Sequence, residues 1–206
     1  MRLFRLTFLF FTVVGIARSE ESRPTIASFF QTSENRGIVA SPQKADVCIL
    51  REKKSLFSKR STGKYKEGEY VILSSEAAAL IGSKLRDEKT YDWESLKMCH
   101  PIYNARVRFH RDGHFVYADF CFGCDILRLG KDGIPFGGAN FDEVSDEIFE
   151  VIRSHFPKDS VVQAVQKQKK QRVIIRAQME EAIRLDREKK SKQQATSSET
   201  PSVVAP

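Results

Sequence analysis

The sequence lacks the short motifs that mark several large enzyme classes. It contains no G-x-S-x-G nucleophile elbow, no phosphate-binding P-loop and no G-x-G-x-x-G dinucleotide fingerprint. Gly137-Gly138 alone indicates a loop and not a phosphate cradle. Motif evidence for hydrolase, nucleotidase or dehydrogenase activity is therefore missing, which favours a non-enzymatic protein.

Long apolar runs are also missing, except at the start of the chain. Basic Arg2 and Arg5 precede an apolar run over residues 6–17, and the small residues Ala17 and Ser19 fit a cleavage site. We therefore expect residues 1–19 to be a signal peptide and the protein to be exported, either periplasmic or secreted. About 12 apolar residues are short for a membrane span of roughly 20, so retention at the membrane requires an uncleaved signal. No cysteine follows the run that could carry a lipoprotein-type acyl chain.

An excess of basic residues is present overall but not in the middle of the chain. The net charge is +7, of which Arg2, Arg5 and Arg18 contribute +3. Residues 158–206 carry 11 basic and 6 acidic side chains, so residues 20–157 are close to neutral. The core therefore offers no electrostatic case for specific nucleic-acid binding. The basic C-terminal region could instead contact an anionic surface.

Cysteine is scarce, yet three of the four cysteines lie between residues 99 and 124. Apolar residues at 105, 107 and 109 alternate with polar residues at 106, 108 and 110, as in a strand with one buried face. Arg111-Asp112-Gly113 supplies a turn, and residues 114–120 return antiparallel. Pairing His110 with His114 places Cys99 near Cys121-x-x-Cys124, and a two-residue turn shifts this pairing by one. The two histidines flank the turn, where exposed side chains are commoner than a metal or proton site.

The other segments complete an α+β domain over residues 45–157, with a small antiparallel sheet centred on this cysteine-flanked hairpin and one or two packed helices. Strands are expected at 47–50, 70–73 and 125–129, and loops at 51–66, 130–133 and 136–138. A helix should begin at Ser74 or Ser75, and an amphipathic helix should run from Phe141 until Pro157 ends it. We expect Tyr91 and Trp93 to fold back on the core.

Polar segments flank this domain. Residues 20–44 are rich in Ser, Thr, Pro and Gln and are expected to be a flexible lead-in. Residues 158–194 should form a charged helix that buries little apolar area, since its apolar stripe is interrupted and too poor for a convincing coiled coil. Residues 195–206 are expected to be a disordered tail.

The middle of the chain resembles a group of small exported bacterial proteins that have no assigned activity. The matching pieces are Cys99, Pro101, Cys121-Phe122-Gly123-Cys124 and the helix start Phe141-Asp142-Glu143. The resemblance covers roughly residues 45–157 and excludes the basic C-terminal helix. It implies export and a shared small domain, and it brings no activity, cofactor or partner with it.

Three roles remain open for the cysteines. A structural disulfide is typical of small exported domains, and the hairpin register favours Cys99 with Cys124, which leaves Cys48 as a buried thiol or as the partner of the leftover sulfur. A zinc site could use Cys99, His100, Cys121 and Cys124, although a second C-x-x-C is missing. Thiol–disulfide exchange could use Cys121-x-x-Cys124, although a strand and not a helix is expected to follow. A haem attachment motif is excluded because residue 125 is Asp.

The sequence thus predicts an exported small binding or envelope-associated domain, stabilised by a cysteine cluster and of unknown ligand. The alternative is a zinc-binding or thiol-redox protein that uses Cys99, Cys121 and Cys124.

Overall fold

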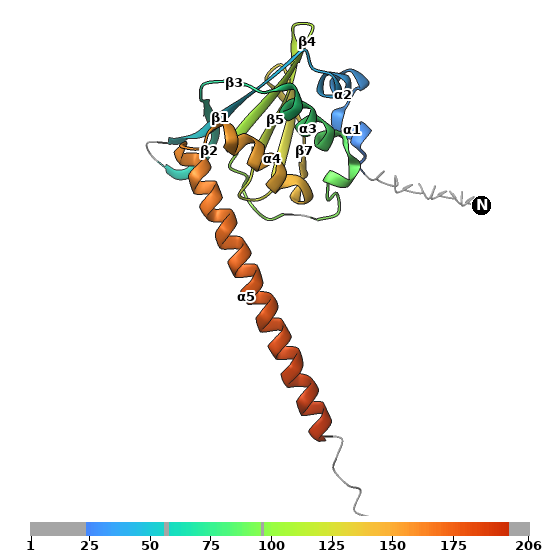
Figure 1. Ribbon diagram of the computed structural model, residues 1–206, viewed down its shortest axis with the longest axis vertical. Helices are drawn as coiled ribbons and strands as arrows, with labels where there is room; N and C mark the ends of the chain where they lie inside the picture. Colours follow the sequence, from blue (N-terminus) through green and yellow to red (C-terminus); the bar gives the residue numbers. More distant parts are fainter. Residues whose placement is uncertain (1–23, 56–57, 96, 198–206) are drawn as a thin grey trace, which may run out of the picture.

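Seven antiparallel strands form one sheet that carries helices on one face. The computed structural model describes residues 24–55, 58–95 and 97–197, so the predicted signal peptide lies outside the described residues. The strand order is β2-β1-β4-β5-β6-β7, and β3 pairs with β1 on the same side as β2 (Figure 1). The strands are β1 Lys44–Ser55, β2 Ser58–Glu67, β3 Val71–Ile72, β4 Ala105–Arg111, β5 His114–Cys121, β6 Ile126–Lys131 and β7 Ile134–Asn140. The helices are α1 Ile26–Phe30, α2 Ser33–Ala40, α3 Ser75–Arg86, the 3-10 turn η1 Glu88–Thr90, α4 Asp142–His155 and α5 Ser160–Ser197. The predicted α+β class is confirmed.

The central hairpin β4–β5 is present, with a register one residue away from the predicted pairing of His110 with His114. Arg111 pairs with His114, and Ala105 pairs with Phe120. Asp112 and Gly113 form the two-residue turn, with φ of 51° and 82°. Both residues are left-handed, as a type I′ hairpin turn requires, and glycine accepts this conformation without a Cβ clash.

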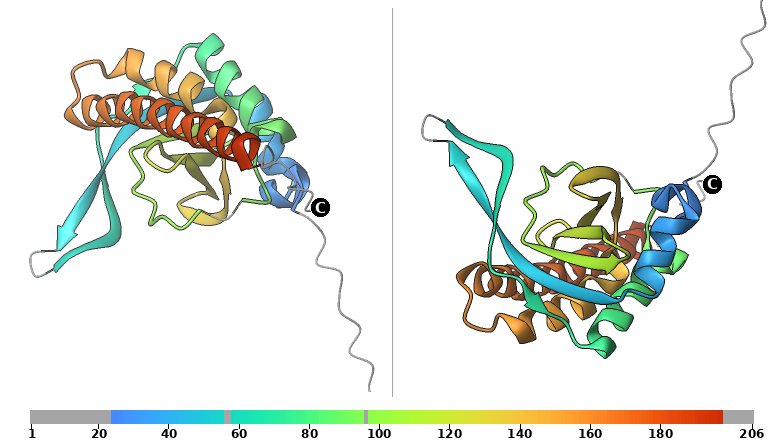
Figure 2. Two further views of the ribbon diagram at one scale, coloured as in Figure 1. Left: turned by 90° about the horizontal axis from the view of Figure 1, so that it is seen from below. Right: turned by 90° about the horizontal axis from the view of Figure 1, so that it is seen from above.

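Two segments expected to be loops are strands. Residues 51–55 and 58–66 of the basic segment belong to β1 and β2, whose hairpin extends away from the body of the molecule (Figure 2). Residues 136–138 belong to β7, although glycine has a low strand propensity. Here tertiary contact requires the small residue, because a Cβ on Gly137 would lie 3.0 Å from the ring of Phe29.

The prediction that residues 20–44 form a flexible lead-in is also wrong for residues 24–44. Thr25 caps α1 and Thr32 caps α2, each by accepting a hydrogen bond from a backbone N–H of the first turn. Phe29 and Phe30 of α1 are buried in the core. Helices of 5 and 8 residues are too short to show a clear helical period in the sequence, so their apolar residues did not reveal them.

The two longer helices over the sheet follow the sequence. Ser74 caps α3, and α4 ends before Pro157. Gly82 in the middle of α3 permits close packing against α2, because a Cβ there would lie 2.7 Å from the carbonyl oxygen of Val39. Tyr91 and Trp93 stack on each other at 4.8 Å and pack against the core, as predicted.

The sheet face without helices is covered by its own charged and aromatic side chains. Fully buried Asp119 accepts hydrogen bonds from Arg106 (2.6 Å) and Arg128 (2.6 Å). Their guanidinium groups lie over the rings of Tyr117 and Tyr103. The polar residues that alternate along β4 are therefore partners in a buried network and not a solvated face.

Helix α5 starts on the domain and then projects from it (Figure 1). Val162 and Val165 are buried in the core, so the expectation that residues 158–194 bury little apolar area is wrong for the first turns. The helix continues to Ser197, three residues into the predicted tail. Of the helices in the described part of the chain, none has the length and apolar character to cross a membrane.

Candidate functional site

A disulfide between Cys99 and Cys124 ties the segment before β4 to the turn after β5. The two Cα atoms lie 6.6 Å apart, and the pair is the one that the hairpin register favours. Cys48 and Cys121 are free and buried, and they pack in one cluster with Tyr103. All four cysteines therefore gather at one end of the sheet.

The buried Cys48 thiol is poorly suited to chemistry. Burial raises the pKa of Cys48 to about 11, although Tyr70 beside it acts in the opposite direction. Since the thiolate is the reactive form, Cys48 is an inert thiol at neutral pH.

The predicted zinc ligands do not form a metal site in the oxidised protein. Across residues 24–55, 58–95 and 97–197, no group of three His, Cys, Asp or Glu side chains is arranged to hold a metal ion. Cys99 and Cys124 are bonded to each other, His100 is exposed and Cys121 is buried. Zinc binding would require the reduced protein, and it stays a prediction.

Cys121-x-x-Cys124 runs from the last residue of β5 into the turn that leads to β6. It does not lie at a helix N-terminus, in agreement with the strand that the sequence predicted after it. Cys124 packs against the cluster that contains the Cys121 thiol. Exchange between this thiol and the disulfide stays a prediction.

The two hairpin histidines have separate carboxylate partners. His110 Nε2 lies 3.0 Å from Asp46, and burial lowers the pKa of His110 despite this neighbour. His114 Nδ1 lies 2.9 Å from Asp132 in the next turn. Each histidine thus has a structural role in the contacts between neighbouring strands and turns.

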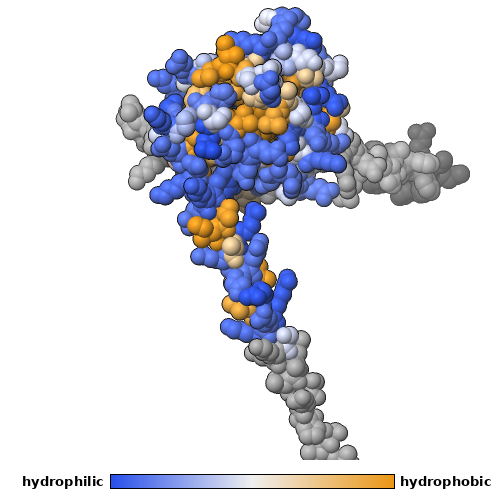
Figure 3. All heavy atoms as spheres, in the orientation of Figure 1, coloured by the Kyte–Doolittle hydropathy of each residue, from blue (hydrophilic) through white to orange (hydrophobic). Residues whose placement is uncertain are grey.

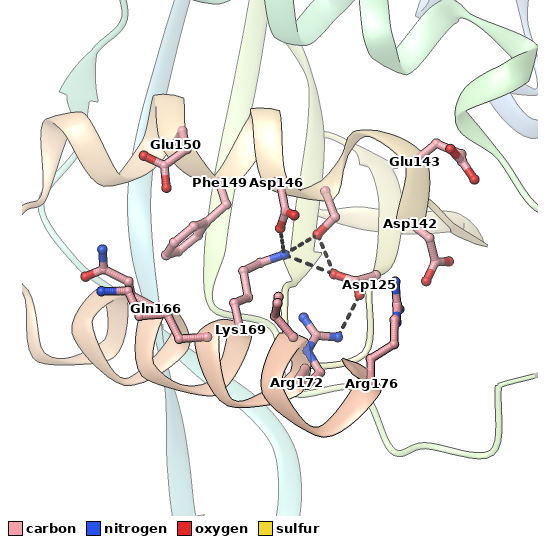
Figure 4. Close-up of a pocket in the computed structure, with 13 residues that line it drawn as sticks. Asp125, Asp142, Glu143, Asp146, Phe149, Glu150, Gln166, Lys169, Arg172 and Arg176 are labelled. Carbon is pink, nitrogen blue, oxygen red and sulfur yellow. Dashed lines mark hydrogen bonds and ion pairs between the residues drawn. The ribbon is translucent and has the colours of Figure 1, made fainter. Parts of the chain in front are cut away.

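The residue that organises this end of the molecule is Asp125, which directly follows the disulfide. Its φ of 52° is left-handed, and its side chain points toward α4 and α5 (Figure 4). Its carboxylate accepts hydrogen bonds from Arg172 at 2.7 Å and from Ser145 Oγ, and it forms an ion pair with Lys169. Burial opposes the charge of Asp125, but the hydrogen bonds from Arg172 and Ser145 and the charge of Lys169 outweigh it and lower its pKa.

Lys169 and Arg172 attach α5 to the disulfide turn. Lys169 Nζ lies 2.8 Å from Ser145 Oγ and 2.6 Å from Asp146 (Figure 4). Arg172 also donates to the carbonyl oxygens of Phe122 (2.8 Å) and Gly123 (3.2 Å). We call Asp125, Ser145, Lys169 and Arg172 the clamp.

From the opposite side, Lys97 completes the fixation of this turn. Its Nζ lies 2.7 Å from the carbonyl oxygen of Cys124 and 2.5 Å from Asp142. The turn is therefore held by a disulfide, by α5 and by the segment before β4.

The clamp forms the base of an open cavity of about 620 Å³ between α4 and α5. Figure 4 shows acidic side chains along α4 facing basic side chains along α5. The acidic wall comprises Asp142, Glu143, Asp146 and Glu150, and the basic wall comprises Lys169, Lys170, Arg172 and Arg176. A cavity with one acidic and one basic wall favours a polar ligand or partner surface that carries both signs of charge.

The contact between Ser145 and Lys169 resembles the pairing in serine–lysine hydrolases, but the surroundings are wrong for that chemistry. A general base needs a neutral amine, whereas Lys169 pairs as an ammonium group with Asp125 and Asp146. The Ser145 hydroxyl donates to Asp125, and its side chain is buried. The arrangement therefore joins the helices and does not activate a nucleophile.

Beyond the clamp, α5 leaves the domain with apolar side chains exposed. Every described side chain from residue 173 to residue 191 is exposed. Figure 3 shows hydrophobic patches along the projecting helix between hydrophilic side chains. The large apolar residues there are Val173, Ile174, Ile175, Met179, Ile183 and Leu185.

Sequence reasoning missed the clamp, although one signal was available. The apolar stripe of α5 is interrupted between Val165 and Val173, and Lys169 and Arg172 fill that interval at helical spacing on the side that faces the domain. A charged pair in the middle of a stripe can mark an ion-paired docking contact. Nothing in the sequence indicated that Asp125 would be its partner.

Comparison of the chain with protein-family models, with curated proteins and with solved structures finds no match in any of the three. The site must therefore be interpreted from its own geometry.

Proposed function

We propose that this protein is an exported, non-enzymatic binding domain whose projecting α5 helix is the partner-binding element. The observation that carries the proposal is the run of exposed apolar side chains on a helix that the clamp holds at a fixed exit from the domain. Burying such side chains against a partner is favourable by about 1 kcal/mol each when they are half exposed at the start.

The distribution of these side chains supports a protein partner. Successive helix residues lie about 100° apart, so Val173, Ile174 and Ile175 cover three sides of α5. A helix that lies on a membrane surface needs one apolar face opposite a polar one. Apolar residues on several sides favour enclosure by other protein elements, and we prefer this to the anionic surface that the basic charge suggested.

Export is the other part of the proposal, and it depends on the signal peptide predicted from the sequence. A disulfide at Cys99–Cys124 is compatible with an oxidising compartment. Protein isolated from its natural source should begin at or near Glu20. An intact Met1 on soluble cytoplasmic protein would contradict export without affecting the binding helix.

Site-specific photocrosslinking in the cells of the source organism tests the binding helix. A benzophenone amino acid at Met179, which is 60% exposed, should give a discrete protein adduct. The matched control is the same amino acid at Ile72, which is 65% exposed on β3 and lies outside α5, and it should give no such adduct. An adduct of twice the chain mass would identify a second copy as the partner, and a different mass would identify another protein. Lipid adducts, or no adduct at either position, would contradict the proposal.

A further inference from the structure

Strand β7 is the last strand of the described sheet, so one side of its backbone has no neighbouring strand. In a strand, both backbone polar groups of a residue face the same side, and alternate residues face opposite sides. The carbonyl oxygen of Asn140 accepts the Asp92 N–H at 3.3 Å, and the carbonyl oxygen of Phe136 accepts from Gln31 Nε2 at 3.2 Å. Both residues therefore face outward.

Gly138 lies two residues before Asn140 in the regular part of the ladder with β6, so it faces outward as well, whereas the ladder is irregular at Phe136. No hydrogen bond to its N–H or C=O comes from any described element outside the sheet. Between the contacts at Phe136 and Asn140, only the N–H and C=O of Gly138 face outward, so an added strand can form one pair of backbone hydrogen bonds there. The outward carbonyl oxygens of Phe136 and Asn140 thus have partners within the chain, and no described residue outside the sheet pairs with the backbone of Gly138 between them.

A cavity of about 440 Å³ lies along this open stretch, between β7, the start of α1 and the segment after η1. Phe29, Trp93 and Phe136 supply an aromatic lining. Trp93 Nε1 is buried without a hydrogen-bond partner. This nitrogen is out of reach of solvent, so Trp93 offers a ligand its apolar ring and not a hydrogen bond.

The charged residues of the lining indicate which charge a ligand should carry. Asp92 and Lys97 are the charged residues that line this cavity. Asp92 accepts the backbone N–H groups of Glu94 and Ser95, and Lys97 pairs with Asp142. Both charges are already satisfied, so the lining favours uncharged side chains.

We propose that the outer edge of β7 binds an extended, uncharged peptide segment of another protein, which pairs its backbone with Gly138. The peptide adds a short strand to the sheet, and an apolar side chain packs against the aromatic lining. This is recognition by strand addition, in which the backbone supplies affinity and the cavity supplies selectivity. The site is separate from α5 and does not depend on the function proposed for it.

Nuclear magnetic resonance on the full chain tests the proposal with a defined probe, acetyl-Thr-Val-Ala-Val-Thr-amide. Trp93 is the single tryptophan, so its indole N–H gives one unambiguous signal. Both this signal and the Gly138 amide should shift and saturate as the probe is added. The control probe is the same peptide with every backbone nitrogen methylated, which keeps the side chains but removes the donors. It should not bind.

Protein variants separate the two contacts. Gly138→Pro removes an N–H that the ladder with β6 does not use and should weaken binding about fivefold. Trp93→Ala removes part of the aromatic lining and should weaken binding similarly when the Gly138 amide is observed. Ile134→Ala is the matched control on the same strand, because Ile134 does not line the cavity. It should bind like the natural protein.

No saturable shift, or equal binding of the methylated probe, would overturn the proposal even if a variant failed to fold. Binding that appears only after residues 1–23 are removed would assign the edge to the chain's own N-terminal segment. That result would overturn a partner peptide as the occupant.

Discussion

Replacing Asp125 with Asn should release α5 from the domain. Asparagine is nearly isosteric and tolerates the left-handed backbone at this position, so the change removes the charge without adding strain. Hydrogen bonds to a charged group contribute about 1.5–3 kcal/mol each. Asp125 and Lys169 are each 12% exposed, whereas Arg172 is 38% exposed, which weakens its share through solvent screening. We expect the free energy required to open the clamp to fall by about 2–3 kcal/mol.

Hydrogen exchange measures this loss directly. Amides of residues 162–172 should exchange roughly 30- to 150-fold faster in Asp125→Asn, since 1.4 kcal/mol corresponds to a factor of ten. Amides in β4 and β5 should change much less, because the ladder that joins these two strands does not involve the clamp. The urea midpoint should fall with little change in slope.

The matched control is Asp146→Asn. Asp146 also pairs with Lys169, at 2.6 Å, but its side chain is 86% exposed. An exposed pair of this kind contributes about 0–1 kcal/mol. Equal effects of the two substitutions, or no change in exchange at α5 for Asp125→Asn, would refute the assignment of Asp125 as the centre of the clamp.

The remaining predictions concern acid, sulfur, packing and the free helix. The folded-state pKa of Asp125 lies below its ordinary value of 3.8, so its stabilisation should be complete near neutral pH and be lost as the pH falls below about 4 and through the folded-state pKa. The difference in stability between the natural protein and Asp125→Asn should shrink over this range in acid titrations of unfolding. Cys99→Ala should cost roughly 3–4 kcal/mol in urea unfolding by opening the disulfide loop, against about 1 kcal/mol for Cys121→Ala; equal costs would contradict the pairing. Gly130→Ala should destabilise the fold severely, since the new Cβ would lie 2.2 Å from the ring of Tyr117, and soluble protein with an unchanged melting temperature would refute this contact. Deleting residues 173–206 should leave the melting temperature within about 2 °C, because the described side chains removed are exposed; a larger drop would show that they pack.

Local sequence signals were sufficient for the turns and helix ends that are fixed by residues within the element itself. Asp112-Gly113 defined the central hairpin because few residues accept two left-handed positions in succession. Ser74 and Pro157 marked helix ends through a cap and a missing N–H. The favoured partner of Cys99 followed from the hairpin register alone, since pairing fixes which residues meet at the open end.

The tertiary structure decided what depends on partners distant in the chain. Phe29 lies in a polar segment, and its contacts with Tyr91 and Gly137, distant in the chain, help to explain why residues 24–44 fold and why β7 tolerates glycine. Arg106 on β4 is largely buried because Asp119 on the next strand accepts its hydrogen bonds, and alternation along one strand cannot show this partner. The same holds for the clamp: helical spacing placed Lys169 and Arg172 on one side of α5, but a carboxylate 47 residues away from Arg172 determined where that side docks. Electrostatic and packing partners depend on which residues are close in space. The sequence therefore showed which side of a helix or strand makes contacts, but not which residues that side contacts.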